Sequence, residues 1–466
     1  MSPVAITALF LSLWEIIGRK LPSLPQGPWP RIPRLAVAVG SLLLVAGFGA
    51  QLLLLAYQAG HDGVRPDWVS RTPFLYVDEA FPFGPDHRLI SLAALAAVLA
   101  QMAGFLALVG AVAQPAETPA DAAAGRFSSA LAPLVAGVLA VLALWSPAVS
   151  SGDVFGYAGL GMLGPHPFER PPHFFRGEYA AVFDSWHLRP TIYGPLWTTL
   201  NAAVVSFGTT FAGKVLALRV FGLVLLLALT GLVHVLVRSR AVTLAVLLNP
   251  MLWLQFVTNA HNDILGACLL AAAQIFIVRK RPALAVFCVA GAGLVKFPFV
   301  VMGAVAFARQ GPRRAFGYAA AAAVVCFVLS AIFAGRPYLD ALLLTARTRA
   351  AFTDPVLNEI KLVLSLATLA VTAIILLRGK YPAFAGWLYT GLAPVMFPWY
   401  LLWAVSYSLF SRTLLLATLL SLPLVALLSD DVYAFDMLAF VLPAAAGLWL
   451  LWSTRATPGR LRPASR

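Results

Sequence analysis

The sequence predicts an all-α membrane protein that crosses the bilayer many times. Of its 466 residues, 61% are hydrophobic and only 11% are charged, a composition that excludes a soluble globular domain. The apolar residues gather in runs of about 17 to 25, the length that a helix needs to span a bilayer. The basic residues, which give a net charge of +14, stand in short clusters between these runs. Such clusters report topology, and we expect no nucleic-acid partner.

The first apolar segment, residues 4–17, is too short to span and contains Glu15. No small-residue cleavage site precedes Arg19 and Lys20, so we expect an interfacial or short helix rather than a cleaved signal. The longer runs predict spanning helices at residues 35–58, 90–113, 128–149, 213–237, 241–258, 263–279, 315–335, 361–378, 413–429 and 434–452.

The positive-inside rule orients these helices. We expect the basic clusters to be cytoplasmic: Arg19/Lys20/Arg31/Arg34, Arg238/Arg240, Arg279/Lys280/Arg281, Arg309/Arg313/Arg314, Arg378/Lys380, Arg412 and the tail Arg455/Arg460/Arg462/Arg466.

Keeping every cluster on one side predicts three segments that do not cross. Residues 196–210 become a re-entrant or interfacial helix. Residues 282–308 go out and return, turning at Lys296-Phe297-Pro298, and residues 383–411 do the same near Pro398-Trp399-Tyr400. Such turns are tolerated only where they line a cavity or are buried in protein. The polar motifs therefore converge on the non-cytoplasmic face.

Asp153 begins a polar, aromatic and proline-rich stretch, residues 150–197, directly after the predicted helix 128–149. An ionisable group at the end of a membrane helix indicates a functional site. Ser151-Gly152-Asp153 is also an ordinary turn sequence, so a structural role stays open.

Basic side chains on the same face are candidate phosphate ligands. Lys296 lies in an apolar stretch, where a phosphate would offset the cost of its charge, or where it snorkels to the outer headgroups. Arg347 and Arg349 lie in a predicted loop, residues 336–360, and bind the same phosphate or are solvated. His261 has ring nitrogens suited to phosphate or hydroxyl groups.

Asn262 and Asp263 precede the predicted helix 263–279. Either residue is a candidate N-cap, which explains both without a functional role. The functional alternative makes His261 and Asp263 a polar pair that binds substrate.

Aromatic residues are frequent near this face, as is general at membrane interfaces. Tyr193 and Trp399 are our candidates for stacking on a sugar, among a set that comprises Phe155, Tyr157, Phe168, Phe174, Phe175, Trp186, Tyr193, Trp197, Trp399 and Tyr400.

The three cysteines lie inside apolar runs and match neither a disulfide framework nor a zinc site. We expect no cofactor, and no spacing demands a divalent metal among His166, His173, His187, His261, Asp153 and Asp184.

An ordered set of short motifs resembles the GT-C superfamily of polyprenyl-phosphate-sugar-dependent glycosyltransferases. The sequence is most similar to the polyprenyl-phosphomannose-dependent α-mannosyltransferases over residues 128–410. The motifs are Ser151-Gly152-Asp153-Val154-Phe155-Gly156-Tyr157, Gly164-Pro165-His166-Pro167-Phe168, Tyr193-Gly194-Pro195-Leu196-Trp197, Asn249-Pro250, His261-Asn262-Asp263, Leu294-Val295-Lys296 and Pro398-Trp399-Tyr400. His166 and Phe155 depart from the asparagine and tyrosine usual in the family.

The resemblance implies a bundle of roughly 12 to 14 transmembrane helices with a large first extracytoplasmic loop that carries a catalytic Asp153. Residues 128–410 would form the catalytic module with the loop 150–212. Residues 1–127, with two extra helices outside the best-matched region, and residues 411–466, with a basic tail, would flank it.

The implied function is transfer of a hexose, with mannose the expected sugar, from a polyprenyl-phosphate carrier to a glycan or lipid-linked acceptor. The family inverts the configuration of a β-linked donor, which implies an α-linked product. The reaction would take place on the extracytoplasmic face of the bacterial inner membrane. Asp153 would be the base, and Lys296, His261, Arg347 and Arg349 would bind the donor phosphate. The implied substrate-binding residues are Tyr157, Tyr193, Asp263, Trp399 and Tyr400.

Two other functions stay open. A flippase or transporter for polyprenyl-linked glycans would place charged residues in mid-helix, whereas these helix interiors are nearly free of charge. A ligase that moves a preassembled glycan would need a large late loop, and the longest patterned loop here is early.

Overall fold

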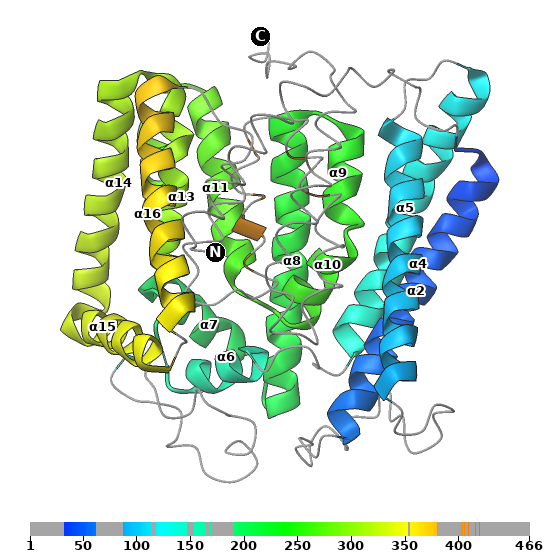
Figure 1. Ribbon diagram of the computed structural model, residues 1–466, viewed down its shortest axis with the longest axis horizontal. Coiled ribbons are helices and arrows are strands. Elements are labelled where there is room, and N and C mark those ends of the chain that lie inside the picture. Colours follow the sequence, from blue (N-terminus) through cyan, green and yellow to red (C-terminus); the bar gives the residue numbers. More distant parts are fainter. Residues whose placement is uncertain are drawn as a thin grey trace.

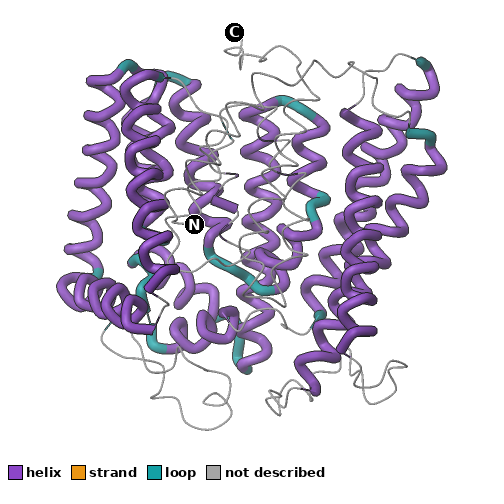
Figure 2. The backbone as a smooth tube through the Cα atoms, in the orientation of Figure 1, coloured by secondary structure: helices purple, strands orange, loops and turns teal. Residues whose placement is uncertain are grey.

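In its described parts, the computed structural model consists of helices and short loops (Figure 2). It describes residues 32–61, 87–113, 118–146, 153–164, 167–168, 191–352 and 355–379, with residues 400, 402, 403, 405, 409, 415 and 419. These residues form helices and no strand, which confirms the predicted all-α class. Within them, five helices are long and apolar enough to cross a membrane, or six if one bent pair counts as a span.

Helices α2 (Arg34–His61), α4 (His87–Ala113) and α5 (Pro119–Trp145) form one edge of the bundle (Figure 1). Small residues bring α2 and α4 together, since a Cβ added at Gly104 would lie 2.2 Å from the carbonyl oxygen of Gly40. Across the same contact, the Gln101 amide donates to Oε1 of Gln51 at 2.9 Å. Close approach at glycine and hydrogen bonds between side chains are the usual means of packing helices in lipid.

The predicted continuous helix 241–258 is wrong. The chain forms α9 (Arg240–Leu247), α10 (Pro250–Leu252) and the π-helix η3 (Trp253–Thr258), with a 40° bend at the break. Pro250 cannot donate to the preceding turn, and Asn249 instead caps α10 by accepting from Met251 N at 3.1 Å. Next to this broken segment stand α8 (Phe211–Val237) and α11 (Asp263–Val278).

The predicted turn at Lys296-Phe297-Pro298 is confirmed. Helix α12 (Pro282–Val295) ends before Lys296, and α13 (Pro298–Ala304) with the 3-10 helix η4 (Val305–Gln310) runs back along it. The antiparallel return is close, because a Cβ at Gly303 would meet Cγ1 of Val289 at 2.6 Å.

The predicted loop 336–360 is also wrong. Its first part is α15 (Gly335–Phe352), which connects α14 (Pro312–Phe333) to α16 (Pro355–Arg378). Alanine, leucine and arginine dominate this segment, and they are strong helix formers. Arg347 and Arg349 therefore lie on a helix.

The polar region 150–212 contains two helices, α6 (Asp153–Met162) and α7 (Pro195–Val205). The second corresponds to the predicted non-crossing helix 196–210, whereas α6 was not predicted. Both are too short to span a bilayer. They lie across one end of the bundle, as does α15 (Figure 1). This agrees with the prediction that residues 196–210 do not cross. The predicted segments 4–17 and 434–452, and most of 383–411 and 413–429, lie outside the described residues.

The two ends of the bundle differ in character. The connections α8–α9, α11–α12, η4–α14 and the C-terminal end of α16 share one end, and the helices α6, α7 and α15 lie at the other (Figure 1). The former connections carry the basic clusters at residues 238–240, 279–281, 309–314 and 378. The bundle thus separates the basic connections from the polar motifs, as the topology argument expected.

Candidate active site

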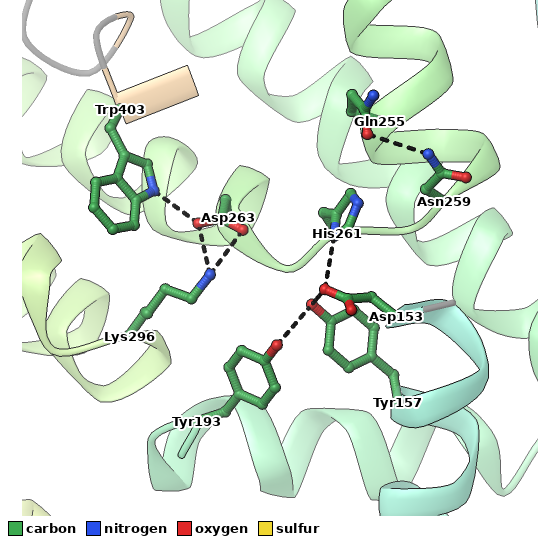
Figure 3. Close-up of polar contacts among 9 residues, drawn as sticks. All are labelled: Asp153, Tyr157, Tyr193, Gln255, Asn259, His261, Asp263, Lys296 and Trp403. Carbon is green, nitrogen blue, oxygen red and sulfur yellow. Dashed lines mark hydrogen bonds and ion pairs between the residues drawn. The ribbon is translucent and has the colours of Figure 1, made fainter. Parts of the chain in front are cut away.

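Asp153 lies at the N-terminal end of α6, where a helix favours negative charge. Its Oδ2 is 3.4 Å from Nδ1 of His261 (Figure 3). The same oxygen lies 3.4 Å from the hydroxyl of Tyr157, one helical turn later on α6. Its side chain keeps 13% exposure, whereas that of His261 is fully enclosed. Asp153 is therefore part of a helix and not the turn residue of the alternative interpretation.

A short chain of phenols continues from Asp153. The hydroxyl of Tyr157 lies 3.3 Å from that of Tyr193, and the two rings pack edge to face. Burial, together with the charge of Asp153, raises the pKa of Tyr193 well above its usual range, and burial does the same to the pKa of Tyr157. Both phenols therefore stay protonated and act as hydrogen-bond donors, and neither is suited to be a base.

His261 is positioned by an irregular connection between η3 and α11. Ala260 has a positive φ of 51°, which is uncommon for a residue with a side chain. The backbone N–H of His261 donates to the carbonyl of Gln255 at 3.1 Å, and the Asn259 amide donates to Oε1 of Gln255 at 3.1 Å. Single π-turns of this kind concentrate at functional sites. Here the turn directs the imidazole toward Asp153 (Figure 3).

A second polar cluster adjoins the first. Lys296 pairs with both carboxylate oxygens of Asp263, at 3.0 and 3.1 Å. The indole of Trp403 donates to Oδ1 of Asp263 at 2.7 Å. The ammonium group lies 4.7 Å from the ring centre of Tyr400, 5.4 Å from that of Tyr193 and 5.8 Å from that of Trp403. The positive charge of Lys296 is thus balanced by one carboxylate and three aromatic rings.

The capping explanation of the His261-Asn262-Asp263 motif is wrong. Asn262 occupies the N-cap position of α11 but its side chain makes no capping bond, and the carboxylate of Asp263 accepts from Lys296 and Trp403. Asn262 is 1% exposed, and neither atom of its amide has a hydrogen-bond partner among the described residues. Buried polar groups in native proteins nearly always have a hydrogen-bond partner, which can be a protein group, an ordered water or a bound ligand.

Gly194 brings Tyr193 against Lys296. A Cβ at this position would lie 2.1 Å from the carbonyl oxygen of Leu294, and the Gly194 N–H donates to Val295 O at 3.0 Å. The Tyr-Gly-Pro motif therefore packs on the end of α12 at backbone distance, which only glycine permits.

The structure brings together most of the predicted site residues, namely Asp153, Tyr157, Tyr193, His261, Asp263, Lys296 and Tyr400. Arg347 and Arg349 are on α15, and their side chains lie outside the described residues, as do Trp399 and His166. Trp403 was not predicted as a site residue, although it is only three positions after Tyr400 in the sequence. No group of three potential metal ligands occurs within the described part of the chain. The expectation that the protein needs no divalent metal stays a prediction.

Arg219, a buried cation inside the spanning helix α8, was also not predicted. The helix interiors are thus less free of charge than we inferred. Arg219 is bonded to backbone carbonyls, and no pattern in the sequence signals such partners.

Comparison with known protein families gives a match. The family described as alpha-(1->6)-mannopyranosyltransferase, N-terminal domain, matches residues 44–310. The match includes most of α2 and all of α4. It ends before Tyr400 and Trp403. Neither the curated proteins nor the solved structures give a match. More than half of the chain fits the family, and the chain therefore belongs to this family of membrane mannosyltransferases.

Proposed function

We propose that this mannosyltransferase takes mannose from a polyprenyl-phosphate carrier and transfers it to a hydroxyl of a glycan or lipid-linked acceptor. The observation that carries the proposal is Asp153, a partly exposed carboxylate at a helix start that contacts His261 and Tyr157 at the end of the bundle opposite the basic connections. The family's printed name makes an α-(1→6) bond the proposed linkage.

In the proposed reaction, the acceptor oxygen attacks the anomeric carbon of mannose while the bond from that carbon to the phosphate oxygen breaks. Asp153 accepts the proton of the acceptor hydroxyl, and the polyprenyl phosphate leaves with the electron pair. Because attack is opposite the leaving group, a β-linked donor gives an α-linked product. Tyr157 and His261 would orient the carboxylate in the manner of a supported base.

We further propose that His261, Lys296, Arg347 and Arg349 contribute to binding of the donor phosphate. A departing phosphate is stabilised by cations and hydrogen-bond donors fixed in advance. Lys296 has a competing partner in Asp263, so its charge would be shared between the carboxylate and the phosphate. Tyr193, Asp263, Trp399 and Tyr400 would contact the sugar or the acceptor.

We propose that the basic end of the bundle faces the cytoplasm of a bacterial cell and that the reaction occurs on the periplasmic or outer face of the inner membrane. The support is the positive-inside rule, applied to the basic connections grouped at one end. A lipid-linked donor fits this location, since nucleotide sugars are made in the cytoplasm. Membrane lipids would be the remaining partners.

Two assays test the proposal. Purified protein in lipid vesicles is given labelled polyprenyl-phosphomannose, polyprenyl-phosphoglucose or GDP-mannose together with a crude lipid-glycan acceptor. We expect transfer from the first donor and little from the other two. Transfer from GDP-mannose alone would overturn the lipid donor. Dialysis against EDTA should leave the rate unchanged, because we propose a reaction that needs no divalent metal.

A further inference from the structure

Arg219 is a charged residue buried within the spanning helix α8. It is 5% exposed and lies about two turns from the helix start at Phe211. A charge at such a position is costly in a membrane and is kept where it serves a function. In the described part of the chain, no carboxylate forms an ion pair with it.

The guanidinium group instead bonds three backbone carbonyls. Nε donates to Thr258 O at 2.8 Å, and Nη1 donates to Leu144 O at 3.0 Å and also to Ser146 O. Leu144 and Ser146 form the C-terminal end of α5, and Thr258 is the last residue of η3. Carbonyls at helix ends lack partners within the helix and carry partial negative charge, so one arginine satisfies two helix ends at once.

These two helix ends lead directly to the two contacting residues of the site. Ser146 is seven positions before Asp153 in the sequence, and Thr258 is three positions before His261. Helices α5 and η3 also pack against each other, and Arg219 adds charged hydrogen bonds to both of their ends. We propose that Arg219 is a positioning residue, which fixes these two segments relative to each other so that Asp153 and His261 meet. This proposal rests on the proposed role of Asp153 as the base.

The chemistry of arginine suits this role. Its planar group carries N–H donors along several directions in a rigid fork, so that it reaches two chain segments simultaneously. Lys214, on the same helix, provides a comparison. Its ammonium donates to Val205 O at 3.3 Å and to Gly208 O at 2.8 Å, which caps only the end of α7. Lys214 therefore stabilises one helix end without joining the two segments that carry the reacting pair.

Variants Arg219→Lys and Arg219→Gln test the proposal, with Lys214→Gln as the matched control. Each is purified in detergent, its thermal unfolding is recorded, and kcat and KM are measured on the folded protein. We expect kcat to fall about 10- to 100-fold in the Arg219 variants, since a misplacement of about 1 Å can cost that much. KM for the donor should stay near the wild-type value, because Arg219 does not contact substrate. Lys214→Gln should keep the wild-type kcat.

A double-mutant cycle with His261→Ala separates positioning from a general loss of structure. If Arg219 acts through the contact between Asp153 and His261, then His261→Ala should cost much less in the Arg219→Lys background than in the wild type. Additive effects, or a folded Arg219→Lys or Arg219→Gln variant with the wild-type kcat, would overturn the proposal.

The cycle uses whichever donor the wild type accepts, so a wrong donor assignment does not affect it. Asp153→Asn is measured in parallel. If that variant keeps wild-type turnover, the failure lies in the proposed base and not in the link that Arg219 makes.

Discussion

Asp153 Oδ2 lies 3.4 Å from Nδ1 of His261, although the two residues come from α6 and from the connection that follows η3. A short helix start supplies the carboxylate, and an irregular π-turn supplies the imidazole. Neither element spans the membrane alone, and both lie where spanning segments end. The site is therefore assembled from the breaks in the helices, where backbone and side chains are free to bind polar groups.

Removing the Tyr157 hydroxyl should weaken this site without changing its pH dependence. In Tyr157→Phe the carboxylate of Asp153 loses a donor, and a hydrogen bond to a charged group contributes about 1.5 to 3 kcal/mol, so kcat should fall about tenfold or more. Because burial raises the pKa of Tyr157, its phenol stays protonated at every ordinary assay pH. The alkaline limb of the pH–rate profile should therefore be the same in the variant. A limb that disappears with the hydroxyl would show that Tyr157 titrates.

Breaking the buried pair between Lys296 and Asp263 should lower stability strongly. Asp263→Asn leaves a buried ammonium group without its counter-charge, which typically costs about 3 to 5 kcal/mol. The double variant Lys296→Met/Asp263→Asn should recover part of that loss. Thermal unfolding in detergent measures both.

The control for this prediction is the pair between Arg336 and Asp340 on α15, whose side chains are 89% and 60% exposed. Arg336→Gln should change the unfolding temperature by no more than the measurement error. An equal fall in unfolding temperature on breaking either pair would contradict the prediction that burial makes the Lys296–Asp263 pair the more stabilising one.

Alanine at Gly194 should displace Tyr193 from the site. The added methyl group would overlap the carbonyl of Leu294, which belongs to α12 and cannot rotate away. We expect Gly194→Ala to lower both the unfolding temperature and kcat. Gly231→Ala is the matched control, because a Cβ on that face of α8 meets no atom within 4 Å and alanine favours helix. Wild-type behaviour of Gly194→Ala would show that the two segments separate easily.

Asn262 should matter to activity and not to stability. Its buried amide makes no hydrogen bond to the described residues, so replacing it by alanine removes an unsatisfied group at little cost to folding. If the amide binds a hydroxyl of the sugar or acceptor, Asn262→Ala lowers kcat/KM by about tenfold or more. A variant with lower stability and normal kcat/KM would assign Asn262 to the fold instead.

Much of the fold was predictable because the bilayer imposes simple rules on a sequence. Apolar length gave α2, α4, α8, α11 and α14 to within three residues at each end, whereas α5 begins nine residues before its predicted start. The arrangement of basic residues predicted the return at Lys296. The failures have local causes. Asn249-Pro250 breaks the apolar run 241–258, whose composition alone predicts one helix. The charged residues of α15 lower the hydropathy of that segment below the value typical of a spanning helix, although arginine favours helix formation.

The site was predictable where a motif marks it and unpredictable where contacts join distant segments. Asp153, His261 and Lys296 stand out because charge is rare in this sequence. Nothing in the sequence indicates that Lys296 pairs with Asp263, that Trp403 donates to that carboxylate, or that Arg219 joins the ends of α5 and η3. Those relationships depend on how helices pack, which hydropathy does not encode.

The most direct test of the account is transfer from labelled polyprenyl-phosphomannose by wild type and Asp153→Asn, both reconstituted in lipid vesicles with the same acceptor. The side chains of aspartate and asparagine have nearly the same shape, so the unfolding temperatures of the wild type and Asp153→Asn should differ little. We predict that the wild type transfers mannose and that the variant loses at least about a hundredfold in kcat, the contribution typical of a general base. Turnover near the wild-type rate in a folded Asp153→Asn variant would contradict the assignment of Asp153 as the base.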